Sequence, residues 1–204
     1  MIRRRWMGVL LAAALSFTAG ALRGQDASPA DKEKALALLE SSRKGVLDAT
    51  KGLNEAQWNF KSAPDKWSVA ECVEHIAAAE DLIRGMIADN VMKAPAAPDR
   101  DLAKTDAAVL NMVPSREKKV QAPEPLKPTN RYGSPEASLK HFEESRAATE
   151  AFLKTTPNLR GHAVDSPLGM KLDAYEWILY TAAHSERHTK QILEVKADAN
   201  FPKK

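Results

Sequence analysis

The stretch D-A-Y-E-W-I-L-Y-T-A-A-H-S-E-R-H-T-K-Q-I-L-E-V-K at residues 173–196 decides the fold. It contains no glycine or proline, and its alanine, leucine, lysine and glutamate residues favour a helix. Asp173 followed by Glu176 predicts the helix start, and the pattern continues to about Lys196. Because an α-helix turns by about 100° per residue, His184 and His188 lie one turn apart on the same face.

This face of the predicted helix is mostly apolar or aromatic. Four residues lie within about 40° of His184 on the helical wheel: Trp177, Tyr180, Gln191 and Val195. We therefore expect the two imidazoles to point into a core. Burial without partners is costly, and two adjacent imidazolium charges repel. A divalent metal bound to neutral imidazoles avoids both costs. The H-x-x-x-H pair alone is also compatible with a surface pair or with two hydrogen-bonded core histidines.

Three further helices have legible starts. Ser28, Ser68 and Ser134 are each a good N-cap, and the second of them begins an S-x-x-E capping box. The first two helices run to about Thr50 and Met92. Residues 93–133 between the second and third of these helices are proline-rich, with a short helix expected at 100–112. The pattern predicts an all-α four-helix bundle in which this long crossover lets the second and third helices run parallel.

His75 lies on the second helix, beside its apolar stripe. Ala78 and Ala79 on the following turn would leave space near its ring. A third inward histidine from another helix completes a set with His184 and His188. Three protein ligands with an open fourth position are typical of a catalytic zinc site.

Other residues near this set have competing interpretations. Glu71 is a ligand or proton carrier, or only the capping-box acid. Cys72 is a soft ligand or a small buried residue. His162 approaches the site or is an exposed loop histidine, and His141 is interpreted as surface or core. Four aromatic residues either wall a substrate pocket or belong to the core: Trp58, Trp67, Trp177 and Tyr180.

The N-terminus has the order of a secretory signal peptide. Arg3, Arg4 and Arg5 precede an uncharged apolar run and then small residues, which predicts a signal over residues 1–24 and one helical domain over 25–204. The alternatives are a retained anchor, although the run is short for a membrane span, and a twin-arginine signal. We expect an exported protein, periplasmic or secreted, with no stable membrane insertion after cleavage.

Charge and cysteine content argue against a nucleic-acid-binding protein and against a fold held by internal disulfides. The chain has 30 basic and 27 acidic residues, a net charge of +3. Without the four arginines of residues 1–24 the balance becomes 26 to 27, a net charge of −1. This balance does not favour nucleic acid as a partner. The single cysteine cannot form a disulfide within the chain.

Four segments together resemble the DinB-like family. W-S-V-A-E-C-V-E-H-I (67–76) and H-S-E-R-H-T-K-Q-I (184–192) resemble its second and fourth helices. R-E-K-K-V-Q-A-P-E-P-L-K-P-T (116–129) and P-L-G-M-K-L-D-A-Y-E-W (167–177) resemble one subgroup's crossover and its entry to the last helix. The similarity covers about residues 30–197, and the order of the segments makes it fairly specific.

The resemblance implies a DinB-like bundle that is often a homodimer. It also implies a divalent metal, commonly zinc or nickel, held by residues that match His75, His184 and His188. Some relatives are metal-dependent thiol transferases, others resemble isomerases, and many have no assigned activity. Family members are mostly cytoplasmic, whereas this chain is expected to be exported. Export weakens the transferase interpretation, because thiol cofactors are scarce outside the cell.

Three functions follow from these patterns. The first is a metal-dependent enzyme of thiol-transferase or hydrolase type that acts on a small electrophile, with Glu71 or His162 as weak candidate proton carriers. The second is a non-catalytic metal-binding or stress-related bundle of the cell envelope. The third is a structural bundle without metal. The sequence names neither the substrate nor a dedicated catalytic base.

Overall fold

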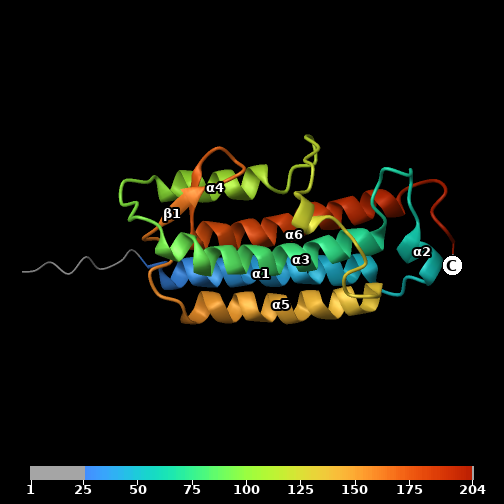
Figure 1. The fold of residues 1–204 in the computed structure, drawn as a ribbon, viewed down its shortest axis with the longest axis horizontal. Coiled ribbons are helices and arrows are strands. Elements are labelled where there is room, and N and C mark those ends of the chain that lie inside the picture. Colours follow the sequence, from blue (N-terminus) through green and yellow to red (C-terminus); the bar gives the residue numbers. More distant parts are fainter. Residues whose placement is uncertain (1–25, 204) are drawn as a thin grey trace, which may run out of the picture.

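The computed structural model describes residues 26–203, so the predicted signal peptide lies outside the described residues. Four long helices lie side by side (Figure 1). Helices α1 and α6 run in one direction, and α3 and α5 run in the opposite direction. The parallel course of α3 and α5, predicted from the long crossover, is therefore confirmed. The four helices are α1 (Pro29–Thr50), α3 (Val69–Asp89), α5 (Pro135–Thr155) and α6 (Ala174–Lys196).

Each long helix begins at a side chain that caps its first turn. Ser28, Ser68, Ser134 and Asp173 each accept a hydrogen bond from the backbone N–H three residues later. In three of the four helices an acidic residue at that position bonds back to the cap, which completes a capping box. A cap of this kind stabilises a helix by about 1 kcal/mol, so the local sequence determines where the helices start.

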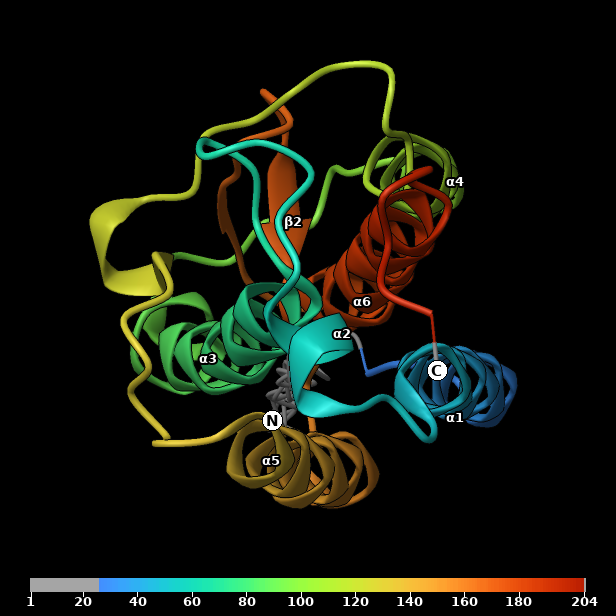
Figure 2. The same ribbon diagram turned by 90° about the vertical axis from the view of Figure 1, so that its right-hand side faces the viewer.

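Six shorter elements of the described residues lie outside the four long helices. Figure 2 shows α4 outside α6, and the crossover passing from α4 towards α3. The short helix α2 (Glu55–Asn59) and the small antiparallel hairpin of β1 with β2 were not predicted. A helix of five residues and strands of three residues are too short to show a periodic pattern. Helix α4 matches the short helix expected at 100–112. The shorter elements are α2 (Glu55–Asn59), η1 (Val91–Lys93), α4 (Leu102–Met112), η2 (Glu124–Leu126), β1 (Ala163–Asp165) and β2 (Lys171–Asp173).

A buried ion pair crosses the middle of the bundle. Arg146 of α5 donates from Nε and Nη2 to the two carboxylate oxygens of Glu80 on α3, at 2.7 and 3.0 Å. Its remaining donors reach Ser42 of α1 and Ser185 of α6, each at 2.9 Å. One guanidinium therefore links all four long helices. None of the described helices is long and apolar enough to cross a membrane.

Candidate metal centre

Three imidazoles meet between α3 and α6. The Nε2 atom of His184 lies 3.1 Å from Nε2 of His75 and 3.1 Å from Nε2 of His188. The possible ligand atoms all lie within 4.8 Å of one another. His75 and His188 are 3% and 7% exposed, whereas His184 is half-buried. The structure thus brings together the three histidines that the sequence singled out.

Hydrogen bonds on the far side of two rings direct their Nε2 atoms to the centre. Nδ1 of His75 lies 2.8 Å from the Leu126 carbonyl, which can only accept, so Nδ1 carries the proton. Nδ1 of His188 lies 2.9 Å from Oε1 of Gln191 and donates in the same way. Arg116 Nη1 donates to the same Gln191 oxygen at 3.1 Å. Both Nε2 atoms therefore present lone pairs to the centre, the form in which histidine binds a metal.

The electrostatic environment keeps these rings neutral. Burial lowers the pKa of His75. Burial, followed by the neighbouring imidazoles, holds the pKa of His184 and of His188 well below the usual range. Metal ligands must be deprotonated, and here the protein favours that state at neutral pH. Three converging neutral imidazoles, two of which have their Nε2 lone pairs directed by hydrogen bonds, fit a divalent ion of the kind that imidazole prefers.

Two aromatic residues border the centre. The ring centroid of Trp67 lies 4.7 Å from that of His75 and 6.1 Å from that of His188. Tyr180 stacks on His184 at 6.1 Å, with 16° between the ring planes. Both are partly exposed, while Trp58 and Trp177 are buried. Of the four aromatic residues with two interpretations, Trp67 and Tyr180 contact the site.

The two candidate proton carriers do not join the centre. Glu71 completes the α3 cap, where Oε2 accepts from the Ser68 backbone N–H at 2.7 Å, and its other oxygen pairs with Lys61 at 2.9 Å. His162 pairs with Ala96 in a β-bridge before β1, and its Nδ1 lies 2.6 Å from the Ala94 carbonyl. Local partners therefore occupy both side chains. The metal-capable cluster found in residues 26–203 contains neither of them.

Cys72 and His141 also lie outside this cluster. Cys72 is fully buried in the core, and burial raises the pKa of its thiol. The thiol is accordingly a small core residue rather than a nucleophile. His141 bonds to Asp81 at 2.6 Å and stacks on Tyr132. Its hydrogen bond therefore joins α5 to α3, away from the three-histidine cluster.

Two further residues support the centre and have no role in the sequence-based hypotheses. Glu74 accepts hydrogen bonds from the backbone N–H groups of Thr129, Asn130 and Arg131, at 2.7, 2.8 and 3.2 Å. It thereby anchors the end of the crossover whose Leu126 carbonyl orients His75. Gln191 orients His188 from one turn further along α6. The only signal for Gln191 in the sequence is its place on the histidine face.

We expect Gln191→Leu to weaken metal binding by about 10- to 100-fold, the usual effect of removing a partner that orients a ligand. The substitution leaves Nδ1 of His188 without its acceptor. Competition with a chromophoric chelator measures the change. Gln191→Glu is the matched control, because it keeps an acceptor oxygen and should retain tight binding. Equal affinity in the leucine variant and the unsubstituted protein would contradict this role.

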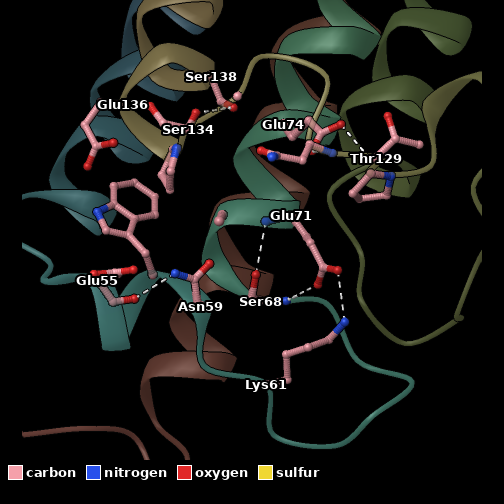
Figure 3. Close-up of a pocket in the computed structure, with 16 residues that line it drawn as sticks. Glu55, Asn59, Lys61, Ser68, Glu71, Glu74, Thr129, Ser134, Glu136 and Ser138 are labelled. Atoms are coloured by element: carbon pink, nitrogen blue, oxygen red, sulfur yellow. Dashed lines mark hydrogen bonds and ion pairs between the residues drawn. The ribbon is translucent and has the colours of Figure 1, made fainter.

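A cavity of about 750 Å³ opens at the end of the bundle where α3 and α5 begin (Figure 3). Its wall carries four carboxylates, Glu55, Glu71, Glu74 and Glu136. Glu71 and Glu74 already have partners, in the α3 cap and in the crossover anchor. None of the three histidines lines this cavity. It is therefore separate from the metal centre.

Comparison with known proteins gives one family. Residues 38–192 match the model of the DinB superfamily. An uncharacterized protein of Bacillus subtilis (strain 168), YuaE, is 23% identical over 164 residues, which cover 79% of this chain and 96% of that protein. The solved structure of YfiT from Bacillus subtilis aligns with a TM-score of 0.52 at 16% identity, over 83% of this chain and 88% of that one. YfiT is described as a probable metal-dependent hydrolase with an unusual four-helix bundle topology.

Proposed function

Since this chain belongs to the DinB superfamily and brings three neutral imidazoles to one point, we propose that it is an exported, metal-dependent enzyme that acts on a small electrophile. The convergence of the three Nε2 atoms carries the proposal. A divalent ion, with zinc or nickel as first candidates, supplies Lewis acidity that lowers the pKa of a nucleophile and polarises the electrophile. His75, His184 and His188 hold it, and the Leu126 carbonyl and Gln191 keep two of these rings oriented.

Tyr180 is the side chain best placed to contact a substrate. It stacks on half-buried His184, where the centre is most exposed. Within residues 26–203 its hydroxyl makes no hydrogen bond. Burial raises the pKa of this phenol, so the group stays protonated at neutral pH and donates a hydrogen bond to a substrate oxygen. Glu71 and His162 have no part in this proposal.

Hydrolysis is the first reaction to test. YfiT, which shares the fold, is described as a probable metal-dependent hydrolase. Water is available outside the cell, whereas the thiol cofactors that a transferase needs are scarce there. The only cysteine is buried and has a raised thiol pKa, so the chain itself supplies no thiol nucleophile.

Removal of the metal is expected to abolish turnover, and reloading with zinc or nickel to restore it. Chelator-treated and reloaded protein is assayed with ester and amide substrates, and separately with a thiol plus an electrophile. Tyr180→Phe should retain stoichiometric metal and lose roughly 100- to 1,000-fold in kcat, the scale of one lost transition-state hydrogen bond. Stoichiometric metal without turnover in either assay would overturn the enzyme and favour the second function, a non-catalytic metal-binding protein.

A further inference from the structure

Arg187 is a buried cation without an anion. It lies on α6 between His184 and His188, and only 9% of the residue is exposed. Within residues 26–203 its one hydrogen bond runs from Nη2 to the Lys118 carbonyl in the crossover, at 2.7 Å. A guanidinium offers five N–H donors. No carboxylate in residues 26–203 pairs with it, and residues 1–25 contain no acidic side chain.

The other two buried arginines show what this chain ordinarily does with such a charge. Arg146 binds both oxygens of Glu80, and Arg160 binds both oxygens of Asp106 at 2.7 and 2.8 Å. A buried charge without a counter-ion is unfavourable, so buried arginines are normally paired.

The unused donors of Arg187 remain accessible. The buried nitrogens and oxygens that lack partners in residues 26–203 do not include any atom of Arg187. Its free N–H groups are therefore in contact with solvent, although the side chain as a whole is packed.

Arg187 also lies beside the metal ligands on α6. On a wheel of about 100° per residue it lies about 60° from His184, on the side of Tyr180 and Gln191. Arg116, the other cation here, is neutralised by Glu194 at 2.7 Å.

We propose that Arg187 binds an oxyanion, a carboxylate or a phosphate, on the substrate of the three-histidine centre. This inference rests on the proposed function and names the substrate class: small anionic electrophiles, with Arg187 on the anionic group and Tyr180 beside the reacting one. A planar guanidinium with two free N–H groups on one edge matches a carboxylate or a phosphate in a bidentate pair. Neutral and cationic compounds would leave this charge without a partner.

The structural alternative is that Arg187 only fastens the crossover through the Lys118 carbonyl. Binding measurements separate the two roles without any assay of turnover. Zinc-loaded protein is titrated calorimetrically, at constant ionic strength, with acetate, inorganic phosphate and acetamide. Acetamide has the shape of acetate without its charge. Tighter binding of acetate or of phosphate tells which oxyanion the site prefers.

We expect one oxyanion to bind and acetamide not to bind. Arg187→Gln should weaken oxyanion binding at least about tenfold, as expected for a lost hydrogen bond to a charged group. Arg187→Lys should retain part of it, and both variants should keep stoichiometric zinc. Lys190→Gln is the matched control, because it removes a cation of the same helix that pairs with Glu186 at the surface, and it should bind like the unsubstituted protein.

Three results would overturn the inference: neither oxyanion binds, acetamide binds equally well, or Arg187→Gln binds as tightly as the unsubstituted protein. If the glutamine variant has a lowered melting temperature, the lysine variant decides, since it keeps the cation and a donor for the Lys118 carbonyl. Failure of the proposed function is a different observation. If only the proposed function fails, the oxyanion still binds in a way that depends on Arg187, but the metal-loaded protein turns over no substrate.

Discussion

Replacing His184 by alanine is expected to abolish stoichiometric metal binding. His184 is the middle ligand of the three, because its Nε2 lies 3.1 Å from the Nε2 atoms of both other histidines. The variant retains His75 and His188, two ligands from different helices, and two imidazoles hold a divalent ion far less tightly than three. Elemental analysis of protein purified without a histidine tag measures the loss directly.

The matched controls are His162→Ala and His141→Ala. Both remove an imidazole from a residue whose hydrogen bonds lie elsewhere, to the Ala94 carbonyl and to Asp81. Both should retain one metal per chain. Unchanged metal content in His184→Ala would refute the site, whatever the activity of the protein.

Thermal unfolding gives a second readout of the same substitution. A ligand bound only to the native state stabilises it by mass action, by about 2.7 kcal/mol when the free ligand is at 100 times its Kd. Zinc should therefore raise the melting temperature of the unsubstituted protein, and chelator should reverse the shift. In His184→Ala this response should disappear. A chelator that leaves the melting temperature of the unsubstituted protein unchanged would favour a structural bundle without metal.

Replacing Arg146 by methionine should cost about 3–5 kcal/mol of the free energy of unfolding. Arg146 is fully buried and Glu80 is 1% exposed. Methionine has a similar length but no charge, so the Glu80 carboxylate would remain in the core without a counter-ion. The substitution also removes the donors to Ser42, Ser185 and the Leu39 carbonyl. Urea unfolding followed by circular dichroism measures the change.

The double variant Arg146→Met/Glu80→Leu is the informative control. It removes both charges, so much of the lost stability should return, because uncompensated charge rather than lost attraction dominates the cost. Arg43→Met is the surface control. Arg43 pairs with Glu40 and Glu143 in exposed positions, and its loss should change stability far less. A single variant as stable as the surface control would show that Arg146 does not hold the four helices together.

Much of the fold is determined locally and was therefore predictable. Ser28, Ser68, Ser134 and Asp173 begin their helices because a capping side chain and its backbone partner lie three residues apart. The pair His184 and His188 was predictable for the same reason, since helical geometry places residues four apart on one face. The crossover followed from proline content and length.

Other features depend on the path of the chain. His75 meets His184 across 109 residues of sequence, and the Leu126 carbonyl that orients it is 51 residues away. From its own helix, Glu71 could be the capping-box acid, a ligand or a proton carrier, and its contacts with Ser68 and Lys61 place it in the cap. The hairpin of β1 and β2 was missed because each strand is too short to show a pattern.

Residues 173–196 therefore specified by themselves a capped helix with two imidazoles on an apolar face, because hydrogen bonds and side-chain spacing within one helix depend only on nearby residues. His75 was expected as the third imidazole from its helix and from the family resemblance. Only the tertiary structure determined that its Nε2 lies beside that of His184, that the crossover and Gln191 orient two of the rings, and that Arg187 is buried without an anion among residues 26–203. These features depend on which distant groups pack together, and no local spacing in the sequence encodes that packing.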